Sequence, residues 1–375
     1  MRNTNNIAAI ILAGGYSSRM GRFKPLLPLA GQRTAVETAV RCFSKAGVKT
    51  ITVVTGHASD SLVPVLDSLG VRQVHNEGYA GGMFTSVAVG IRSLAPDIEA
   101  CFILPVDIPL IKSHTIKLLC RALKRTDASV VYPVFQNRRG HPPLITAACF
   151  PAILSGAPAG LRSVLADYEQ SACELAVLDE GVLLDMDIPA DYQAMCRRAA
   201  NGNVPSEAEC MAILATQKMP EPVIRHSTCV AAVAGRLAAA LNRNGFTVDA
   251  GLAAMAGRLH DIAKGRDQHA RQGARILRSL GYGQLADIVA VHTDGGFDES
   301  GLLSEAAIVF LADKLVKGDR VVSLEERFGE PLEKFAANAE ILAAIRRRFC
   351  IARAVAARVE QAAGAQLADV LAGLE

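Results

Sequence analysis

The chain has 375 residues, of which half are hydrophobic and 21% are charged. This composition suits globular domains with sizeable cores, and the length favours about two to three of them. The formal net charge of +3 is too small to indicate a nucleic-acid-binding surface, and no segment approaches the ~20 apolar residues of a membrane span. Nine cysteines without a close Cys-x-x-Cys pair favour free thiols in a cytoplasmic protein over a disulfide framework or a zinc ribbon.

The first informative segment is an apolar run that leads into a glycine-rich loop. Residues 8–12 are apolar, Gly14 and Gly15 follow, and Arg19 and Lys24 lie towards the far end of the loop. Glycines let backbone N–H groups close around phosphate oxygens, which a Cβ would obstruct, and both cations can bind phosphate. The segment therefore predicts a nucleotide triphosphate site. A simple tight turn between a strand and a helix is the alternative.

Short apolar runs alternate with helical patterns as far as residue 198. Strands are predicted at residues 8–12, 50–54, 100–104 and 129–132, with helices between them, for example at 34–45 and 114–124. This alternation predicts an α/β fold with a doubly wound, mostly parallel sheet. Such sheets bind ligands at the carboxyl ends of their strands. Gly14 and Asp107 both follow a predicted strand, so we expect them in one crevice.

Two aspartates are candidate magnesium ligands. Asp107 follows the strand at 100–104, and Asp187 lies in the segment DMDIP. Chemistry on a nucleotide triphosphate requires a divalent cation, carboxylates that hold it, and positive charge near the phosphates. We expect Asp107 and Asp187 to hold Mg²⁺, and Arg19 and Lys24 to act on the phosphates. The alternatives are a turn role for Asp107 and an N-cap role for Asp187 before the next helix.

The composition of the chain changes near residue 199. The segment AANGNVPSE is small and polar and reads as a linker, and the following sequence is rich in Ala and Leu with helical periodicity. Helices are predicted over residues 231–245, where Asn244-Gly245 is a stop signal, over 248–265, and within 341–374. We therefore divide the chain into a nucleotide-handling domain at 1–198, a linker and helical lead-in at 199–220, and an all-helical domain at 221–375.

The helical half contains a pattern of metal-ligand residue types. Imidazole and carboxylate side chains together suit iron, manganese or zinc better than calcium, and a bound metal supplies hydroxide for attack on phosphorus. Lys264, one turn beyond the adjacent His-Asp pair, is placed to steady a substrate phosphate. For any single histidine the alternative is a core or cap residue, and for His269 it is a surface position on a helix. The candidate ligands are His226, His260, Asp261, His269, His292 and Asp313.

The first half of the chain resembles a known family. LAGGYSSRMGRFKPLLPLAG, residues 12–31, is similar to the signature loop of the nucleotidyltransferases that build nucleotide-sugars and dinucleotide forms of molybdenum cofactor. Residues 75–91 and 101–111 resemble further blocks of that family. RRGHPPLI and LLDMDIPADY resemble its branch of molybdopterin cytidylyltransferases. The resemblance implies transfer of CMP from CTP to molybdopterin with release of pyrophosphate, and it leaves a molybdoenzyme as a candidate recipient of the product.

The same resemblance implies a set of nucleotide-binding residues. Gly14 departs from the Leu-Ala-Ala-Gly that is usual in the cytidylyl branch, looks more like the guanylyl branch, and would leave room for a purine. GTP is therefore the alternative to CTP, and a sugar phosphate is the alternative acceptor. The implied residues are Leu12, Ala13, Gly14, Gly15, Ser18, Arg19, Lys24, Asn76, Gly82 and Ser86.

Residues 222–328 resemble the HD superfamily of metal-dependent phosphohydrolases. The string His226…His260-Asp261…Asp313 matches its signature, and His269 and His292 look like the additional ligands of its two-metal subgroup. The resemblance implies one or two transition-metal ions of the iron, manganese or zinc class, with Asp261 and Lys264 taking part in hydrolysis. A regulatory module that binds a nucleotide without hydrolysis is the alternative for this half, and a cofactor-delivery chaperone is an alternative for the whole chain.

Overall fold

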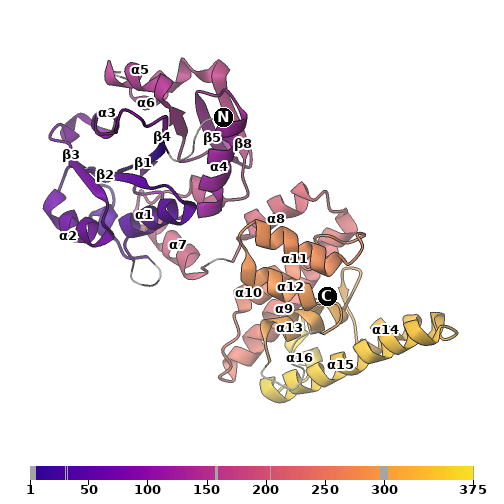
Figure 1. The fold of residues 1–375 in the computed structure, drawn as a ribbon. Helices are drawn as coiled ribbons and strands as arrows, with labels where there is room; N and C mark the ends of the chain where they lie inside the picture. Colours follow the sequence, from indigo (N-terminus) through magenta and orange to yellow (C-terminus); the bar gives the residue numbers. More distant parts are fainter. Residues whose placement is uncertain are drawn as a thin grey trace. The chain divides into compact units, whose positions relative to one another are not determined.

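The computed structural model of the chain describes residues 6–29, 31, 33–156, 159–202, 204–295 and 303–374. It divides into two compact units, Met1–Gly202 and Asn203–Glu375. The first combines a sheet with helices, and the second is built almost wholly of helices (Figure 1). The predicted fold class is confirmed. Among the described helices, none is both long and apolar enough to cross a lipid bilayer.

Eight strands of the first unit form one sheet in the order β3-β2-β1-β4-β7-β5-β6, with β8 paired to β5. The pairs β3–β2, β2–β1, β1–β4 and β5–β8 are parallel, whereas β7 runs antiparallel to β4 and β5. The carboxyl ends of β1, β2, β3 and β4 therefore meet at one edge. The bounds are β1 Ile7–Leu12, β2 Thr50–Thr55, β3 Arg72–His75, β4 Ala100–Pro105, β5 Val130–Phe135, β6 Arg138–Arg139, β7 Leu144–Thr146 and β8 Ala172–Ala176.

Helices cover both faces of this sheet, as a buried parallel sheet requires. All six residues of β1 are buried, so this strand reads as a continuous apolar run. α3, α5 and α6 pack on one face through a shared core, and α1 and α4 lie on the other (Figure 1). The bounds are α1 Ala35–Ala46, α2 Ser59–Leu69, α3 Met83–Arg92, α4 Ser113–Arg125, α5 Phe150–Leu154, α6 Leu161–Ala166 and α7 Pro189–Ala200.

A smaller core fixes the far end of the glycine-rich loop. Met20 and Leu27 pack with Met186 and with Met195 of α7. Lys24 begins a short 3₁₀ helix, Lys24–Leu26, between these contacts. The packing joins the loop to the segment that precedes α7, and so brings residues near 24 and 187 together although they are far apart in the sequence.

The second unit packs around α9, which contacts α10, α13 and α15. As predicted, α9 ends before Asn244, and Gly245 has a left-handed backbone with φ 87°. The prediction of one helix over 248–265 was too long, because α10 ends at Leu259. A two-stranded hairpin is also added to the helices. The bounds are α8 Glu207–Thr216, α9 Glu221–Arg243, α10 Ala250–Leu259, α11 His269–Ser279, α12 Gly283–Val291, α13 Glu305–Lys314, β9 Val316–Lys317, β10 Arg320–Val321, α14 Leu324–Lys334, α15 Ala339–Ala363 and α16 Leu367–Leu371.

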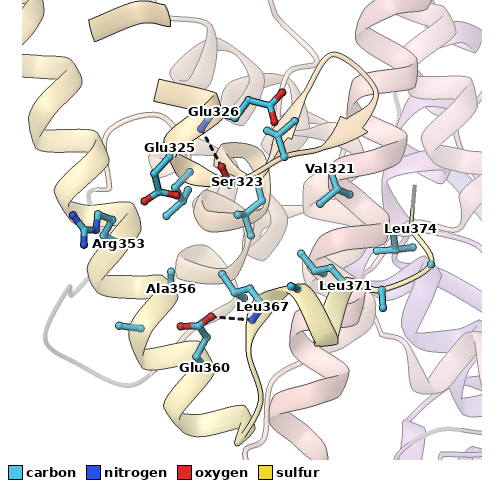
Figure 2. Close-up of a pocket in the computed structure, with 17 residues that line it drawn as sticks. Val321, Ser323, Glu325, Glu326, Arg353, Ala356, Glu360, Leu367, Leu371 and Leu374 are labelled. Carbon is cyan, nitrogen blue, oxygen red and sulfur yellow. Dashed lines mark hydrogen bonds between the residues drawn. The ribbon is translucent and has the colours of Figure 1, made fainter. Parts of the chain in front are cut away.

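A cavity of about 640 Å³ lies among β10, α14, α15 and α16 (Figure 2). Apolar side chains such as Val321, Leu367 and Leu371 line it together with the charged Glu325 and Arg353. Hydrogen bonds fix the ends of its wall helices, since Glu326 N–H donates to Ser323 Oγ at 3.0 Å and Leu367 N–H donates to Glu360 Oε1 at 2.9 Å. None of the predicted metal ligands lines this cavity.

Candidate functional site

The glycine-rich loop is fastened to the end of β2. Ala13 N–H donates to Val54 O at 2.8 Å, and His57 N–H donates to Gly14 O at 3.1 Å. A Cβ on Gly14 would lie 3.1 Å from Gly56 N and 3.2 Å from Thr55 O, which is tight against backbone. Gly14 therefore permits this close approach of two backbones. The space that it leaves faces β2, so the expected extra room for a purine has no support here.

The Lys24 ammonium lies between two carboxylates. Its Nζ is 3.1 Å from Asp107 Oδ2 and 2.8 Å from Asp187 Oδ1, and Arg19 lies 3.0 Å from Asp187 Oδ2. Burial alone would lower the pKa of Lys24, and hydrogen bonds with Asp187 and Asp107 raise it. The hydrogen bond from Lys24 in turn lowers the pKa of Asp187. Two carboxylates that share one cation form a donor set that fits a hard divalent ion.

The backbone around Asp187 turns its carboxylate towards Lys24. The N-cap of α7 is Ile188, and Asp191 Oδ2 accepts the backbone N–H groups of Asp187 and Ile188 at 3.1 and 3.0 Å. The N-cap alternative for Asp187 was therefore wrong. Met186 N–H donates to Asp107 O at 3.2 Å, which ties the two aspartate segments to each other.

A cavity of about 250 Å³ lies beside this cluster. The predicted site residues that line it are Leu12, Ala13, Gly14, Gly15, Lys24, Gly82, Ser86 and Asp107. Ser18, Arg19, Asn76 and Asp187 do not line it. Asn76 is buried, with Nδ2 donating to Thr85 and Ser86 hydroxyls at 2.8 and 2.9 Å and Oδ1 accepting from Gly78 N–H at 3.0 Å. Asn76 thus braces the 76–86 loop that forms one wall.

Sequence reasoning missed two further groups near the aspartates. Burial raises the pKa of Asp185, and the Asp187 and Asp107 charges add to that rise. His141, which lies in the RRGHPPLI block, has a buried Nδ1 with no hydrogen-bond partner among the described residues. Burial lowers its pKa, opposed by Asp107 and Asp185. The Asp-Met-Asp spacing was a usable signal for Asp185, whereas the orphaned nitrogen of His141 is visible only in the structure.

In the second unit, three histidines donate Nδ1–H to backbone carbonyls. His226 donates to Gly318 O at 2.8 Å, His260 to Gly257 O at 2.8 Å, and His292 to Val289 O at 2.7 Å. This pattern leaves the Nε2 lone pairs for a metal, as the outer hydrogen bonds of metal-binding histidines do. The buried Nε2 of His260 has no hydrogen-bond partner among the described residues, so the site fits a metal ion.

Two carboxylates complete the cluster. Asp313 Oδ1 lies 3.1 Å from His226 Nε2 and 3.5 Å from His260 Nε2. Asp261 Oδ1 lies 3.4 Å from His269 Nε2 and 3.7 Å from His292 Nε2. Ligand atoms of His226, His260 and Asp261 form one close group, and those of Asp261, His269 and His292 form another. Asp261 belongs to both groups, so it can bridge two ions. His269 is part of the cluster and not a surface residue alone.

His260 and Asp261 do not lie side by side within a helix as predicted. His260 is the C-cap of α10, with φ −57° and ψ −38°, and Asp261 begins a series of turns. Residues 260 and 261 would diverge by about 100° on a continuous helix. The end of α10 at this point allows both side chains to face the same cluster.

Two lysines neutralise the carboxylates. Lys264 Nζ is 2.5 Å from Asp261 Oδ2, and Lys314 Nζ is 2.5 Å from Asp313 Oδ2. Burial alone would raise the pKa of Asp313, and Lys314 with His226 and His260 lowers it well below its usual value. Lys314 is itself buried. Its position next to Asp313 in the sequence was a signal that sequence reasoning passed over.

Residues 9–173 match the MobA-like NTP transferase domain, and residues 223–318 match the HD domain. The second match contains all six candidate ligands of the helical unit. The first contains Lys24 and Asp107 but ends before Asp187.

Similar individual proteins cover the first half of the chain. A molybdenum cofactor cytidylyltransferase of Escherichia coli K12 is 28% identical over 188 residues, which is 50% of this chain and 93% of that protein. A probable molybdenum cofactor guanylyltransferase of Mycobacterium bovis BCG Pasteur is 33% identical over 133 residues, 35% of this chain and 63% of that protein. Among solved structures, a nucleotidyl transferase from Methanothermobacter thermautotroptrophicus is 22% identical with a TM-score of 0.46, covering 52% of this chain and 97% of that one.

Proposed function

We propose that this chain, which carries a MobA-like NTP transferase domain in its first half and an HD domain in its second, has two active sites. The first transfers CMP from CTP to the phosphate of molybdopterin cofactor and releases pyrophosphate. The observation that supports this most is the position of Lys24. Its ammonium is shared by Asp107 and Asp187 beside a cavity walled by the glycine-rich loop.

The residues of the first site have distinct roles in this reaction. The acceptor phosphate is already anionic, so the protein has to align the reactants and stabilise charge on the leaving pyrophosphate. Backbone N–H groups of the loop bind the triphosphate, and Lys24 and Arg19 offset the charge of its leaving part. Asp107 and Asp187 would hold magnesium, which when bound neutralises charge on the transferring phosphate. Lys24 uses two of its three N–H donors on these carboxylates, and the third can bind phosphate.

CTP is the nucleotide that we favour. The Escherichia coli relative, which matches over 93% of its own length, is named a cytidylyltransferase, and the RRGHPPLI and LLDMDIPADY blocks point the same way. GTP is the second candidate, because relatives named as probable guanylyltransferases share 33% identity over a shorter stretch. A competition between CTP and GTP at equal concentration should append mainly CMP. A product that is mainly GMP would overturn the choice of base and leave the reaction type intact.

The second site is proposed to hydrolyse a phosphoester or phosphoanhydride, and nucleotides are the substrates to test because the first unit is proposed to bind them. His226, His260, Asp261 and Asp313 would hold one transition-metal ion of the iron, manganese or zinc class, and Asp261, His269 and His292 a second. A metal held there would supply hydroxide for attack on phosphorus, and Lys264 would steady the substrate phosphate. A nucleotide-binding regulatory module without hydrolysis is the alternative.

Asp107→Asn tests the first site. The full chain is mixed with magnesium, molybdopterin cofactor and CTP, and pyrophosphate is measured. Loss of a ligand that offsets transition-state charge should lower turnover by about 100-fold or more. Asp97→Asn is the matched control, because Asp97 is exposed and lies in the same unit. Near-normal turnover of Asp107→Asn would place the metal elsewhere.

Asp261→Ala tests the second site. It should abolish phosphohydrolysis and lower the metal content measured by elemental analysis, because Asp261 is shared by both ligand groups. Transfer by the first unit should be unchanged. Asp369→Ala, which removes an exposed carboxylate of α16, is the control. If the wild-type protein is purified with less than about a tenth of an equivalent of metal and binds no more when metal is added, the hydrolase proposal fails and the unit is a binding module.

A further inference from the structure

Three aromatic rings meet at the edge of the sheet that carries the nucleotide cavity. Tyr16 follows the loop glycines, His57 follows β2, and Tyr79 follows β3. The Tyr16 ring centroid is 5.0 Å from that of His57 and 5.4 Å from that of Tyr79. These residues are distant in the sequence, and the parallel strands β1, β2 and β3 bring them together by ending at one edge.

Two side chains of this region are unusually exposed for their type. Tyr16 is 51% exposed and Met83 is 61% exposed. The other exposed large hydrophobic side chains in the described part of the chain are Ile188, Met211 and Ile341. Tyr16, Tyr79 and Met83 all line the cavity that Lys24, Asp107 and the loop glycines also line. Apolar surface gathered on the wall of a binding cavity indicates contact with a ligand.

Packing positions Tyr79, and a backbone hydrogen bond fixes the loop that carries Tyr16. A Cβ on Gly56 would lie 2.7 Å from Tyr79 Cβ and 2.8 Å from Gly14 O, so Tyr79 packs where only glycine leaves room. The hydrogen bond from His57 N–H to Gly14 O fixes the loop that carries Tyr16. A platform of this kind loses little conformational freedom on binding.

We propose that Tyr16, Tyr79 and Met83 form the stacking site for the nucleobase of the bound triphosphate. This inference rests on the proposed nucleotidyl transfer. A nucleotide combines a polyanion with a flat ring, and the cavity offers an ammonium group and a glycine-rich loop for the first and aromatic and thioether surfaces for the second. Every base has a π face. The platform therefore adds affinity for CTP and GTP alike, and polar groups must distinguish between them.

Nucleotide binding without acceptor provides the test. The chain has no tryptophan, and two of its six tyrosines, Tyr16 and Tyr79, line the cavity, so a base that stacks on them quenches part of the tyrosine emission. With magnesium present, CTP and GTP should each quench the emission of the wild-type chain. Tyr16→Ala should raise the Kd of both nucleotides about tenfold, as loss of base–aromatic stacking does, and should remove much of the quenching. Tyr16→Phe, which keeps the ring, should bind both within about twofold of wild type.

Inorganic tripolyphosphate separates stacking from phosphate binding. It has no base, so its Kd should be the same in wild type and Tyr16→Ala. Met211→Ala removes a comparably exposed apolar side chain from the second unit and should change no Kd. Unaltered nucleotide affinity in Tyr16→Ala, or an equal loss for tripolyphosphate, overturns the stacking site while the transfer reaction stands. Failure of the wild-type chain to bind either nucleotide would refute the proposed transfer itself.

Discussion

Raising the pH should destabilise the second unit when no metal is bound, because His260 carries a proton inside its cluster. Burial alone would lower the pKa of His260, and the neighbouring Asp261 and Asp313 carboxylates raise it to about 10. Its side chain is 1% exposed, and Nε2 lies 3.4 Å from Asp261 Oδ2 and 3.5 Å from Asp313 Oδ1. A divalent cation would bind the same Nε2 lone pair of His260 that the proton occupies. Stability is therefore measured with chelator present, so that only the proton contributes.

The direction and size of the effect follow from proton counting. In the unfolded chain a histidine loses its proton near pH 6.5, whereas folded His260 keeps it up to pH about 10. The folded state therefore binds one more proton between these values, and the free energy of unfolding falls by about 1.4 kcal/mol for each pH unit. Full stabilisation is present below pH 6.5. From pH 6.5 to 8.5 the loss should reach roughly 2–3 kcal/mol.

His292 acts against this effect at the lower end of the window. Burial lowers its pKa in the folded state, so the loss of its proton from the unfolded chain near pH 6.5 stabilises the fold slightly and is nearly complete by pH 7.5. Burial raises the pKa of the Cys229 thiol in the folded state, whereas the thiol ionises near pH 8.5 in the unfolded chain. The pH range of the measurement therefore ends at 8.5.

The measurement is a urea series at pH 6.5, 7.5 and 8.5 with chelator, read by hydrogen exchange of peptides from α9 and α10. Those peptides report on the second unit separately from the first. His260→Gln is the control, since it removes the titrating group and should flatten the slope whatever its absolute stability. A flat profile for the wild-type chain, or an equal slope in His260→Gln, would refute the assignment of a proton to His260.

Two further predictions concern the fold. Gly140→Ala should lower the free energy of unfolding of the first unit by about 1–3 kcal/mol, because the new Cβ would lie 2.5 Å from Val182 O; Gly15→Ala, with nothing within 4 Å of its Cβ, should change stability little in the same urea titration. Fragments 1–202 and 204–375 should each stay folded, as measured by circular dichroism. The proposed division at 1–198, 199–220 and 221–375 requires this. Aggregation of the first fragment alone would count against that boundary.

The central strands were predictable because their residues are apolar on both faces. β1, β2 and β4 are short buried runs of this type, and a parallel sheet accounts for them. β3 was missed because its sequence, RQVH, is an edge strand with two exposed residues. Strand pairing at an edge depends on the neighbour and not on the hydrophobic pattern. The helix predicted beyond Leu259 failed because the apolar periodicity continues through Ile262 and Ala263, whereas the chain turns from His260 onwards. His260, Asp261 and Gly265 are poor helix formers, and this signal was outweighed by the periodicity.

The candidate site was predictable where its members share a short segment or a known spacing. The loop glycines and Lys24 belong to one segment, and the His-Asp pair is adjacent in the sequence. Asp107 and Asp187 could be named individually, but their sharing of one ammonium depends on packing between the loop and α7. The contact of Tyr16 with Tyr79 depends on the order of strands in the sheet, which no local pattern contains.

In both units, a lysine ammonium lies against each carboxylate that is expected to hold metal. Lys24 serves Asp107 and Asp187, Lys264 serves Asp261, and Lys314 serves Asp313. Carboxylates brought together in a partly buried site repel one another unless a positive charge compensates them. Here the chain supplies that charge itself, so neither cluster needs a metal ion in order to form. Metal ions would then be held by assembled sites, by Asp107 and Asp187 in the first unit and by a ligand set that includes His260 Nε2 in the second, where the metal would take the place of the proton. Chelation should accordingly remove activity from both units without unfolding either at pH 6.5.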